Sequence, residues 1–324
     1  DPATEEVFGQ ASIASTKDVD RAVEAANRAF STWSSLSPFQ RGEYLRKASQ
    51  LVLERSREIA VLLTREQGKP LKEAEGEVIK SGLILRYYAE EGERIYGRIV
   101  ANDSTNIESH VIYQPIGVVA CITPWNYPVE LLAWKVGAGL AAGCTTVAKL
   151  PTETPLSPLA FLNCLVDAGI PEGAVNALIG PGDILGPALI QHPLVRKVAF
   201  TGSTRTGVSV YRNCAEGLKK VSLELGGSLP MVVCSDCNLH EAVAGAVRRS
   251  FRNMGQICIA INRIYVEESV YEQFLERFEQ STRRLTIGNG LVEDCDLGPM
   301  ANETGLRRVQ AHIEDALSKG AGLV

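Results

Sequence analysis

Three residues stand where covalent catalysis would need them: a cysteine, a glutamate and an asparagine. Cys258 lies in the segment FRNMGQICIAINR beside Gly255 and Gln256, where flexible backbone can bring amide groups close to the sulfur. A thiol becomes a nucleophile near neutral pH when its pKa falls below about 8.5, for which nearby donors or a helix N-terminus are the ordinary means. Spacing alone favours the alternative, a buried cysteine without reactivity.

Glu224 and Asn126 each lie at the carboxyl end of a predicted strand. In LELGG no lysine or arginine neighbours Glu224, so this carboxylate is either a general base whose pKa burial raises or an exposed strand-end residue. Both interpretations stay open. Asn126 follows Pro124 and Trp125, where its amide could donate to a developing oxyanion, although asparagine is more often a turn residue.

Two further segments could bind a nucleotide. Lys149 ends the run TTVAK and could contact ribose hydroxyls or a phosphate, although an exposed lysine is equally consistent with the residue type. Gly202, Ser203 and Gly207 in FTGSTRTG open a helix directly after a strand, and the free amides of a helix N-terminus suit a pyrophosphate. The pattern differs from G-x-G-x-x-G and is weak by itself.

The elements that must position these residues alternate between strands and helices. Residues 19–33 predict a helix with Thr16 as its cap, residues 37–68 a second helix, and a third runs through Tyr87. Residues 107–117 read as a two-strand segment. Continuous apolar runs separated by helical spacing then predict a doubly wound parallel sheet, an α/β fold; these runs are GVVACIT, TTVAK, VNALI, KVAFT and KVSLEL.

A second unit follows Pro230, with the predicted strands MVVC and IYV and helices over 239–252 and 268–284. In parallel sheets, ligands bind outside the carboxyl ends of the strands. The segments that follow the strands are therefore where we look for a site: PWN, KLPT, GPGD, TGS and ELGG.

Composition excludes several classes of protein. A chain of 324 residues, 45% hydrophobic and 22% charged, suits about two globular domains and not a disordered or fibrous protein. The net charge of -5 disfavours nucleic-acid or membrane partners, and without an apolar span or signal peptide we expect a cytoplasmic protein. The eight cysteines suit buried, reduced thiols. Cys234 and Cys237 form a lone CxxC without further ligands, so no metal site is expected.

Together, in this order and spacing, the motifs PWN, K-x-x-x-x-TP, FTGSTxxG, ELGG and F-x-x-x-GQ-x-C resemble the NAD(P)-dependent aldehyde dehydrogenase superfamily. The resemblance runs from DPAT to LGPM at 297–300, and EQGKPLKEAEGEV and GNG at 288–290 are most similar to the succinate-semialdehyde dehydrogenase group. It implies a Rossmann-like cofactor domain over 1–226, with a projecting hairpin near 100–116. Residues 227–324 would be an incomplete α/β catalytic domain.

The resemblance also implies roles for the residues. Cys258 would be the nucleophile and Glu224 the general base, while Asn126 and the backbone amide of Cys258 would form the oxyanion hole. The reaction would oxidise an aldehyde to a free acid, because relatives that pass the thioester to coenzyme A lack the carboxylate. The implied cofactor contacts are Thr123, Pro124, Trp125, Asn126, Lys149, Thr152, Gly182, Gly202, Ser203, Gly207 and Leu225.

The chain departs from the family in three places. NAD-preferring members often carry a glutamate three residues after the lysine; Thr152 stands here, so both NAD and NADP stay open as cofactors. Of the two arginines that bind the far carboxylate in succinate-semialdehyde dehydrogenases, Arg252 matches one, but Trp134 occupies the other position. An apolar or aromatic aldehyde is thus an alternative substrate. Ala260 replaces a second, regulatory cysteine.

Family members continue well beyond Val324, so the chain resembles part of a longer enzyme. In the full-length form we expect a homo-oligomer, a dimer or tetramer, acting on a small-molecule aldehyde. The rival hypothesis is a truncated, non-catalytic piece that binds nucleotide or serves as a structural protein.

Overall fold

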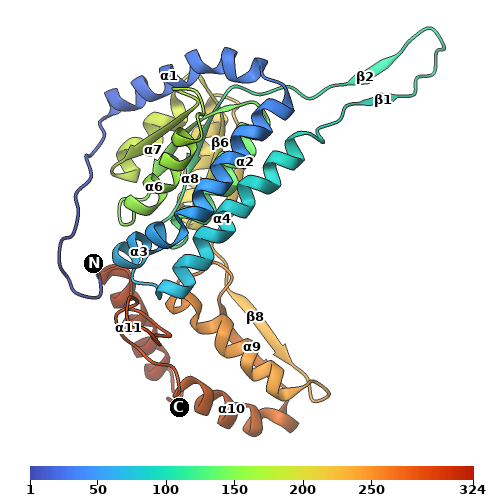
Figure 1. The fold of residues 1–324 in the computed structure, drawn as a ribbon. Helices are drawn as coiled ribbons and strands as arrows, with labels where there is room; N and C mark the ends of the chain where they lie inside the picture. Colours follow the sequence, from blue (N-terminus) through green and yellow to red (C-terminus); the bar gives the residue numbers. More distant parts are fainter. The chain divides into compact units, whose positions relative to one another are not determined.

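The computed structural model describes residues 1–324, which divide into two compact units. The sheet unit comprises Ala11–Ile59 and Gly76–Glu224, and the thiol unit comprises Asp1–Gln10, Ala60–Glu75 and Leu225–Val324. The boundary after Glu224 lies close to the one that the resemblance implies, although two N-terminal segments join the thiol unit. Assignment of a cofactor domain and a catalytic domain to these units stays a prediction. Figure 1 shows the order of the elements along the chain.

The sheet unit is built around five strands in the order β5-β4-β3-β6-β7. These are β3 (Val118–Ile122), β4 (Thr145–Leu150), β5 (Val175–Ile179), β6 (Val195–Gly202) and β7 (Lys220–Leu225, whose last residue falls in the thiol unit). β3 pairs in parallel with both β4 and β6, and β4 pairs in parallel with β5. Every residue of β3 and β4 is buried, as their continuous apolar runs predict. The predicted α/β fold with a parallel sheet is confirmed.

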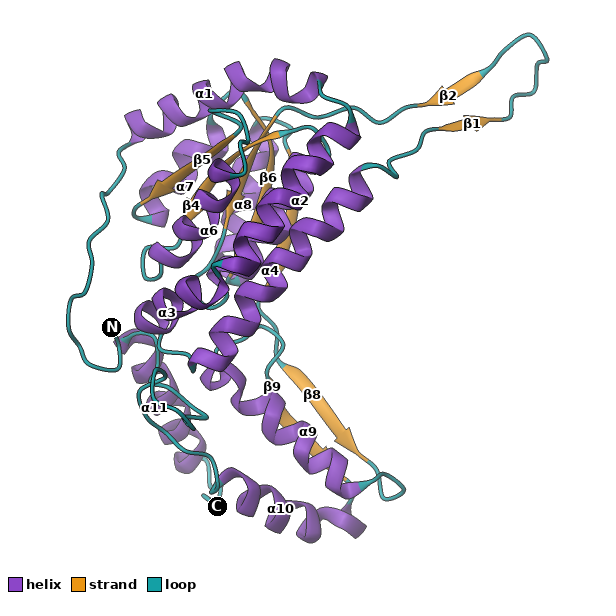
Figure 2. Ribbon diagram, viewed as in Figure 1, coloured by secondary structure: helices purple, strands orange, loops and turns teal.

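Helices cover both faces of this sheet (Figure 2). On one face α5 (Pro128–Ala141) and α6 (Leu156–Asp167) contact the strands, and α2 (Pro38–Glu54) packs on these two helices. A second layer consists of α1 (Thr16–Ser35), α7 (Gly182–Gln191) and α8 (Thr204–Glu216). In this layer α7 contacts both α1 and α8. The strand order reverses at β3, so the chain winds outward from β3 in both directions, the pattern of a doubly wound fold.

Two helix predictions need correction. The cap of α1 is Ser15, not Thr16, because the amide and hydroxyl of Ser15 both donate to the carboxylate of Asp18, at 2.7 and 2.8 Å. The predicted helix over 37–68 is two helices, α2 and α3 (Ser56–Gln67). Arg55 separates them, since its dihedral angles of φ -96° and ψ 10° depart from the helical ladder. The third helix, α4, spans Leu71–Gly92.

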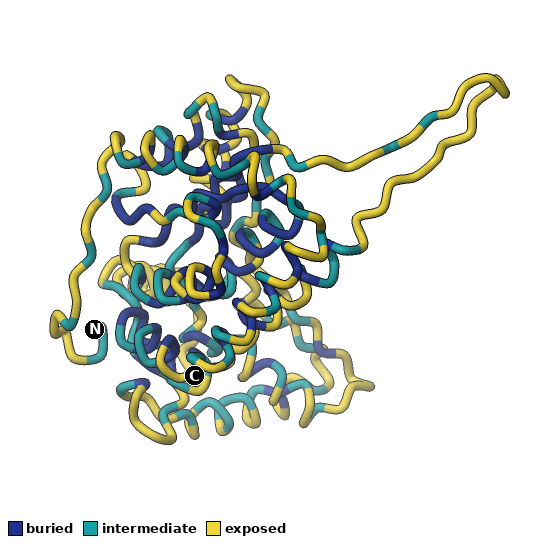
Figure 3. The backbone as a smooth tube through the Cα atoms, turned by 45° about the horizontal axis from the view of Figure 1, so that its top comes forward, coloured by how far each residue is buried: buried dark blue, intermediate teal, exposed yellow.

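The predicted two-strand segment at 107–117 is also wrong. It contributes one strand, β2 (Ser109–Val111), which pairs antiparallel with the earlier strand β1 (Arg98–Val100). The hairpin extends from the sheet unit and is largely exposed (Figure 3). A local sequence pattern could not identify the partner strand, since register and pairing depend on residues outside the segment.

The thiol unit contains a smaller parallel pair, β8 (Leu229–Val233) with β9 (Ile261–Val266). The helices α9 (Leu239–Phe251) and α10 (Glu268–Thr282) pack against it around the buried residues Val233, Val243, Ala246, Val247 and Phe274. A 3-10 turn, η1 (Arg252–Gly255), leads to Cys258, and α11 (Glu303–Ser318) follows the last loop. No helix of the structure combines the length and the apolar character that crossing a bilayer requires.

The cysteines fall into two groups. Cys121, Cys144, Cys164 and Cys214 are buried, whereas Cys234, Cys237 and Cys258 are exposed and Cys295 is partly buried. All are free thiols. The expectation of buried thiols therefore holds for half of them, because only that half lies in the interior of the sheet unit.

We predict that Ser15→Ala lowers the free energy of unfolding by about 1 kcal/mol, the usual loss for a helix cap. Thr16→Ala serves as the control and should have a smaller effect.

The hydrogen bonds from Ser15 hold the pKa of Asp18 below its usual value. The stabilisation is therefore present above the unfolded pKa of about 4 and is lost as pH falls through the lower folded value. Urea unfolding at pH 7 and pH 3 measures both effects; equal losses in the two variants would contradict Ser15 as the cap.

Candidate active site

The carboxyl edge of the five-stranded sheet gathers most of the predicted cofactor residues. β3 and β6 are neighbours, with Ile122 opposite Phe200 near their ends. The loop after β3 leads to α5 on one face, and the loop after β6 leads to α8 in the other layer. Diverging loops at such a switch point leave a crevice, the usual ligand site of an open α/β sheet. Thr123, Pro124, Trp125 and Asn126 directly follow β3, while Gly202 ends β6 and Ser203 follows it.

The loop after β3 is fixed by its neighbours. The amide of Thr123 donates to the carbonyl of Lys149 on the adjacent strand, at 3.4 Å. Thr154 donates its hydroxyl proton to the carbonyl of Trp125, at 3.1 Å. The hydroxyl oxygen of Thr123 is buried and has no hydrogen-bond partner within the protein. A buried hydroxyl without a partner is costly unless a ligand satisfies it, so this atom indicates a binding site.

Lys149 supplies a buried positive charge at the same edge. Its side chain is 6% exposed, and burial lowers its pKa, while the charges of Glu153 and Asp183 oppose that shift. The ammonium makes no ion pair in the structure. Gly182 opens α7, and a side chain there would come within 3.8 Å of the Lys149 Nζ. Thr152 is exposed and donates to the carbonyl of Gly180, at 2.9 Å, which joins the loops after β4 and β5.

The loop after β6 ends in a capped helix. Ser203 is the N-cap of α8 and accepts a hydrogen bond from the amide of Thr206, at 3.2 Å. A Cβ on Gly202 would lie 2.5 Å from the ring of Phe200, so a larger residue would force that ring to move. Gly207 is buried one turn into the helix. The N-terminal amides of this helix suit a phosphate, as the GST segment predicted.

Glu224 is exposed near the end of β7, so the residues of this chain do not desolvate it. The exposure matches the strand-end alternative, and the role of general base stays a prediction. Lys135 on α5 donates to the hydroxyl of Thr201, at 2.6 Å. Burial lowers the pKa of Lys135, and the negative charge of Glu224 opposes that shift. Sequence reasoning missed Lys135, although a lone lysine in the apolar helix PVELLAWKVGAGLA was an available signal.

Cys258 lies in a turn at the end of a strained loop of the thiol unit. Asn253 and Met254 both adopt left-handed backbone conformations, at φ 52° and φ 55°, followed by Gly255 at φ 73°. The amide of Asn253 donates to the Glu73 carboxylate, at 3.0 Å, and its side chain donates to the carbonyl of Gln256, also at 3.0 Å. Strained residues persist only where neighbours hold them, and they cluster at functional sites.

Two more contacts fix this loop. The amide of Ala301 donates to the side-chain oxygen of Gln256, at 3.1 Å. A Cβ added to Gly227 would lie 3.2 Å from the carbonyl oxygen of Cys258, so the second glycine of ELGG allows a close approach of two backbone segments. Cys258 itself is exposed and can be reached by a reactant.

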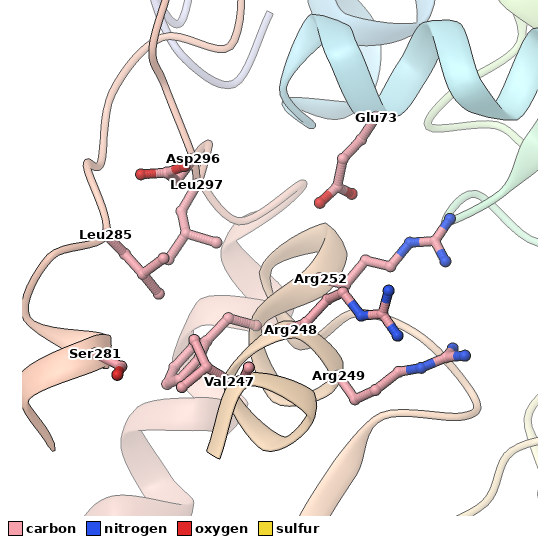
Figure 4. Close-up of a pocket in the computed structure, with 11 residues that line it drawn as sticks. Glu73, Val247, Arg248, Arg249, Arg252, Ser281, Leu285, Asp296 and Leu297 are labelled. Carbon is pink, nitrogen blue, oxygen red and sulfur yellow. The ribbon is translucent and has the colours of Figure 1, made fainter. Parts of the chain in front are cut away.

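The two predicted substrate residues lie in different units. Arg252 in the thiol unit lines a cavity of about 630 Å³ together with Arg248, Arg249 and Glu73. Figure 4 shows the three arginines on one side of this cavity and Asp296 and Leu297 on the other. In the sheet unit, Trp134 makes edge-to-face contacts with Tyr87 and Tyr88, at ring-centroid distances of 6.4 and 5.8 Å.

The structure therefore brings the predicted cofactor residues of the sheet unit to one sheet edge. Asn126 and Glu224 also belong to this unit, whereas Cys258, Arg252 and Leu225 belong to the thiol unit. The combination of Cys258, Glu224 and Asn126 into one catalytic site stays a prediction.

We predict that Met254→Gly raises the free energy of unfolding by about 1 kcal/mol, because a left-handed conformation costs an L-residue about 1–2 kcal/mol and costs glycine nothing. Met254→Ala retains the Cβ and should bring no such gain. Urea denaturation of both variants measures the difference. A gain of equal size in the two variants would show that the side chain, and not the backbone, is the source.

Known proteins resemble this chain over its whole length. A model of the aldehyde dehydrogenase family matches residues 1–324. The chain is 42% identical over 323 residues to the succinate-semialdehyde dehydrogenase [NADP(+)] of Escherichia coli (strain K12), with 100% of this chain and 67% of the relative covered. It is 44% identical over 320 residues to the glutarate-semialdehyde dehydrogenase of Pseudomonas putida, covering 99% of this chain and 67% of the relative.

A solved structure, described as an E. coli NADP-dependent enzyme, superposes with a TM-score of 0.99 at 42% identity, covering 100% of this chain and 67% of that one. The chain thus spans about two thirds of the length of these relatives (67%). Because the family match extends over the whole chain, this chain belongs to the aldehyde dehydrogenase family.

Proposed function

We propose that this chain oxidises an aldehyde to a carboxylic acid with Cys258 as the nucleophile and NADP as the preferred cofactor. The observation that carries the proposal is the loop of Cys258, where strained backbone presents an exposed thiol in a chain of this family. The semialdehyde dehydrogenases among its relatives support the reaction class.

In the proposed reaction the Cys258 thiolate attacks the carbonyl carbon of the aldehyde and gives a thiohemiacetal. The side-chain amide of Asn126 and the backbone amide of Cys258 donate to its oxyanion, where charge develops in the transition state. The bound nicotinamide supplies the acceptor for the hydride that leaves this carbon. Glu224 then takes a proton from the water that hydrolyses the resulting thioester and releases the acid.

The residues at the sheet edge fit a dinucleotide. The buried Thr123 hydroxyl lacks a partner, and the ammonium of Lys149 lacks an ion pair; both suit polar groups of a ligand. The N-termini of α7 and α8, at Gly182 and Ser203, offer amides for phosphate oxygens. These residues would hold the cofactor, and Pro124, Trp125 and Leu225 are the further contacts proposed from the family motif.

NADP is the cofactor that we propose, for three reasons. Thr152 brings no carboxylate to the position where a glutamate would repel a 2'-phosphate, and the buried charge of Lys149 would attract one. The relative from E. coli carries NADP(+) in its name. NAD is the alternative.

For the substrate we propose a short aldehyde with a second, anionic end, such as succinate semialdehyde. Trp134 stands on α5 at the position where an arginine was expected. One helical turn earlier, the carboxylate of Glu130 pairs with the ammonium of Lys80 on α4, at 2.5 Å. The carboxylate of Glu130 is largely buried, whereas Lys80 is 55% exposed and can turn towards an anion. Lys80 would then supply the cation that Trp134 replaces.

The role of Glu224 can be tested by Glu224→Gln. This variant should release an initial burst of reduced cofactor, close to one equivalent, and then turn over more slowly by about 100-fold or more, since a general base contributes about 10²–10⁴. Cys258→Ser should show neither phase. Stopped-flow absorbance of the reduced nicotinamide measures both; steady turnover at the wild-type rate in Glu224→Gln would exclude its role. Silence of a folded wild-type protein would favour the non-catalytic alternative.

The cofactor choice can be tested by Thr152→Glu, with Thr152→Ser as the control. The new carboxylate should weaken NADP binding about tenfold or more and leave NAD binding unchanged or stronger, because it opposes the 2'-phosphate. Fluorescence titration with each reduced cofactor gives the dissociation constants. An equal loss for both cofactors would indicate damage to the loop instead of phosphate recognition.

The substrate proposal is tested by two changes of opposite sign. Lys80→Met should lower kcat/KM for succinate semialdehyde about tenfold, the usual loss of a charged hydrogen bond, and spare the neutral butanal. Glu130→Gln should raise the value for the semialdehyde, because it releases Lys80. Lys47→Met, on the exposed face of α2, is the matched control. Parallel effects on both aldehydes would exclude the ion pair as a determinant of specificity.

A further inference from the structure

Two cysteines outside the proposed site share one tight turn of the thiol unit. Cys234 directly follows β8, and Cys237 directly precedes Asn238, the N-cap of α9. The amide of Cys237 donates to the carbonyl of Cys234, at 3.2 Å, which closes a four-residue turn. Such a turn keeps its end Cα atoms less than about 7 Å apart, and a disulfide needs about 4.4–6.8 Å. The backbone therefore keeps the two Cα atoms near the separation that a disulfide needs.

Neighbouring elements fix this turn from both sides. The carboxylate of Glu267 accepts a hydrogen bond from the amide of Ser235, at 2.7 Å, while its own amide donates to the carbonyl of Val233, at 2.9 Å. The hydrogen bonds from Ser235 hold the pKa of Glu267 below its usual value, so the anchor stays ionised at neutral pH. On the other side, the Asn238 side chain accepts from two amides of α9. The turn therefore keeps its shape without a covalent link.

The accessibility of the two thiols sets them apart. Cys234 and Cys237 are exposed, whereas four other cysteines are buried. Burial raises the pKa of Cys121, for example, to about 12, which keeps it as an unreactive thiol. Cys258 is the third exposed thiol, and it stands alone in its turn. An oxidant in solution thus meets one pair of thiols that can react with each other.

A metal does not fit this pair. The structure contains no group of three or more histidine, cysteine or acidic side chains placed to hold an ion. A structural zinc site needs four ligands, and two thiolates in an open turn would leave half of them to solvent. Thiol chemistry is the better interpretation of the CxxC spacing.

We propose that Cys234 and Cys237 form a reversible intramolecular disulfide, with a small disulfide such as oxidised glutathione as the oxidant. The thiolate of one cysteine attacks a sulfur of oxidised glutathione, breaks its S–S bond and releases one glutathione thiolate. The second cysteine loses its proton and attacks the protein sulfur of the mixed disulfide, which releases the second glutathione. The protein gives up two electrons and two protons, and the oxidised glutathione is reduced to two thiols. The proposal is independent of the aldehyde chemistry.

The test uses the full chain, incubated with oxidised glutathione and examined by intact mass and peptide mapping. Wild-type protein should lose the mass of two hydrogens, mapped to the peptide that contains Cys234 and Cys237. Cys234→Ser and Cys237→Ser should instead each retain one glutathione on the remaining cysteine of the pair. Cys258→Ser should behave as wild type at the pair. Two stable glutathione adducts on wild-type Cys234 and Cys237, or a disulfide that joins either one to Cys258, would overturn the proposal.

A second measurement tests whether the turn favours the disulfide. In redox titrations against glutathione, Glu267→Ala should lower the equilibrium constant for disulfide formation about 2- to 10-fold, the range for one lost hydrogen bond. The neighbouring exposed Glu268→Ala is the matched control and should leave the constant unchanged. Circular dichroism checks that both variants fold. Equal constants in the two variants would show that the Glu267 anchor contributes nothing.

Discussion

The sheet unit depends on the burial of β3 and β4 on both faces. Every residue of the two strands is buried, so each backbone amide and carbonyl must find its partner in the parallel ladder. That requirement fixes the register of β3 against β4 and β6, and hence the level at which each strand ends. Because the strand order reverses at β3, the loops of β3 and β6 must separate. Thr123, Pro124, Trp125, Asn126 and Ser203 lie in those loops, so this part of the predicted cofactor site follows from the packing of the core.

Burial of charge at this edge has a cost that a ligand can offset. Lys149 and Lys135 both lose hydration, which lowers the pKa of each ammonium. Lys135 regains part of that loss by donating to Thr201, whereas Lys149 has no ion pair. A buried cation without a direct partner destabilises the folded chain until an anion binds. Lys149 thus indicates a phosphate or a ribose more strongly than the same residue on a surface would.

The sequence predicted the strands better than the helix ends or the hairpin. Continuous apolar runs such as VVACI can be satisfied only by a sheet covered on both faces, so their prediction holds without knowledge of the partners. The choice of Ser15 over Thr16 as a cap depends on the position of Asp18, and the partner of β2 lies before the segment that was read as two strands. The left-handed conformation of Met254 has no local signal, because this residue is neither glycine nor asparagine.

The thiol loop shows why the exposure of Cys258 is hard to predict from spacing alone. Apolar neighbours such as Ile257 and Ile259 suggest burial, yet Cys258 is exposed. The difference arises from consecutive left-handed residues, which turn the chain sharply after α9 and present the thiol at the end of the loop. Glu73 and the amide of Ala301 hold that geometry from segments far apart in the sequence. The strain is therefore maintained by tertiary hydrogen bonds, and removing those partners would release the loop before it affected the core.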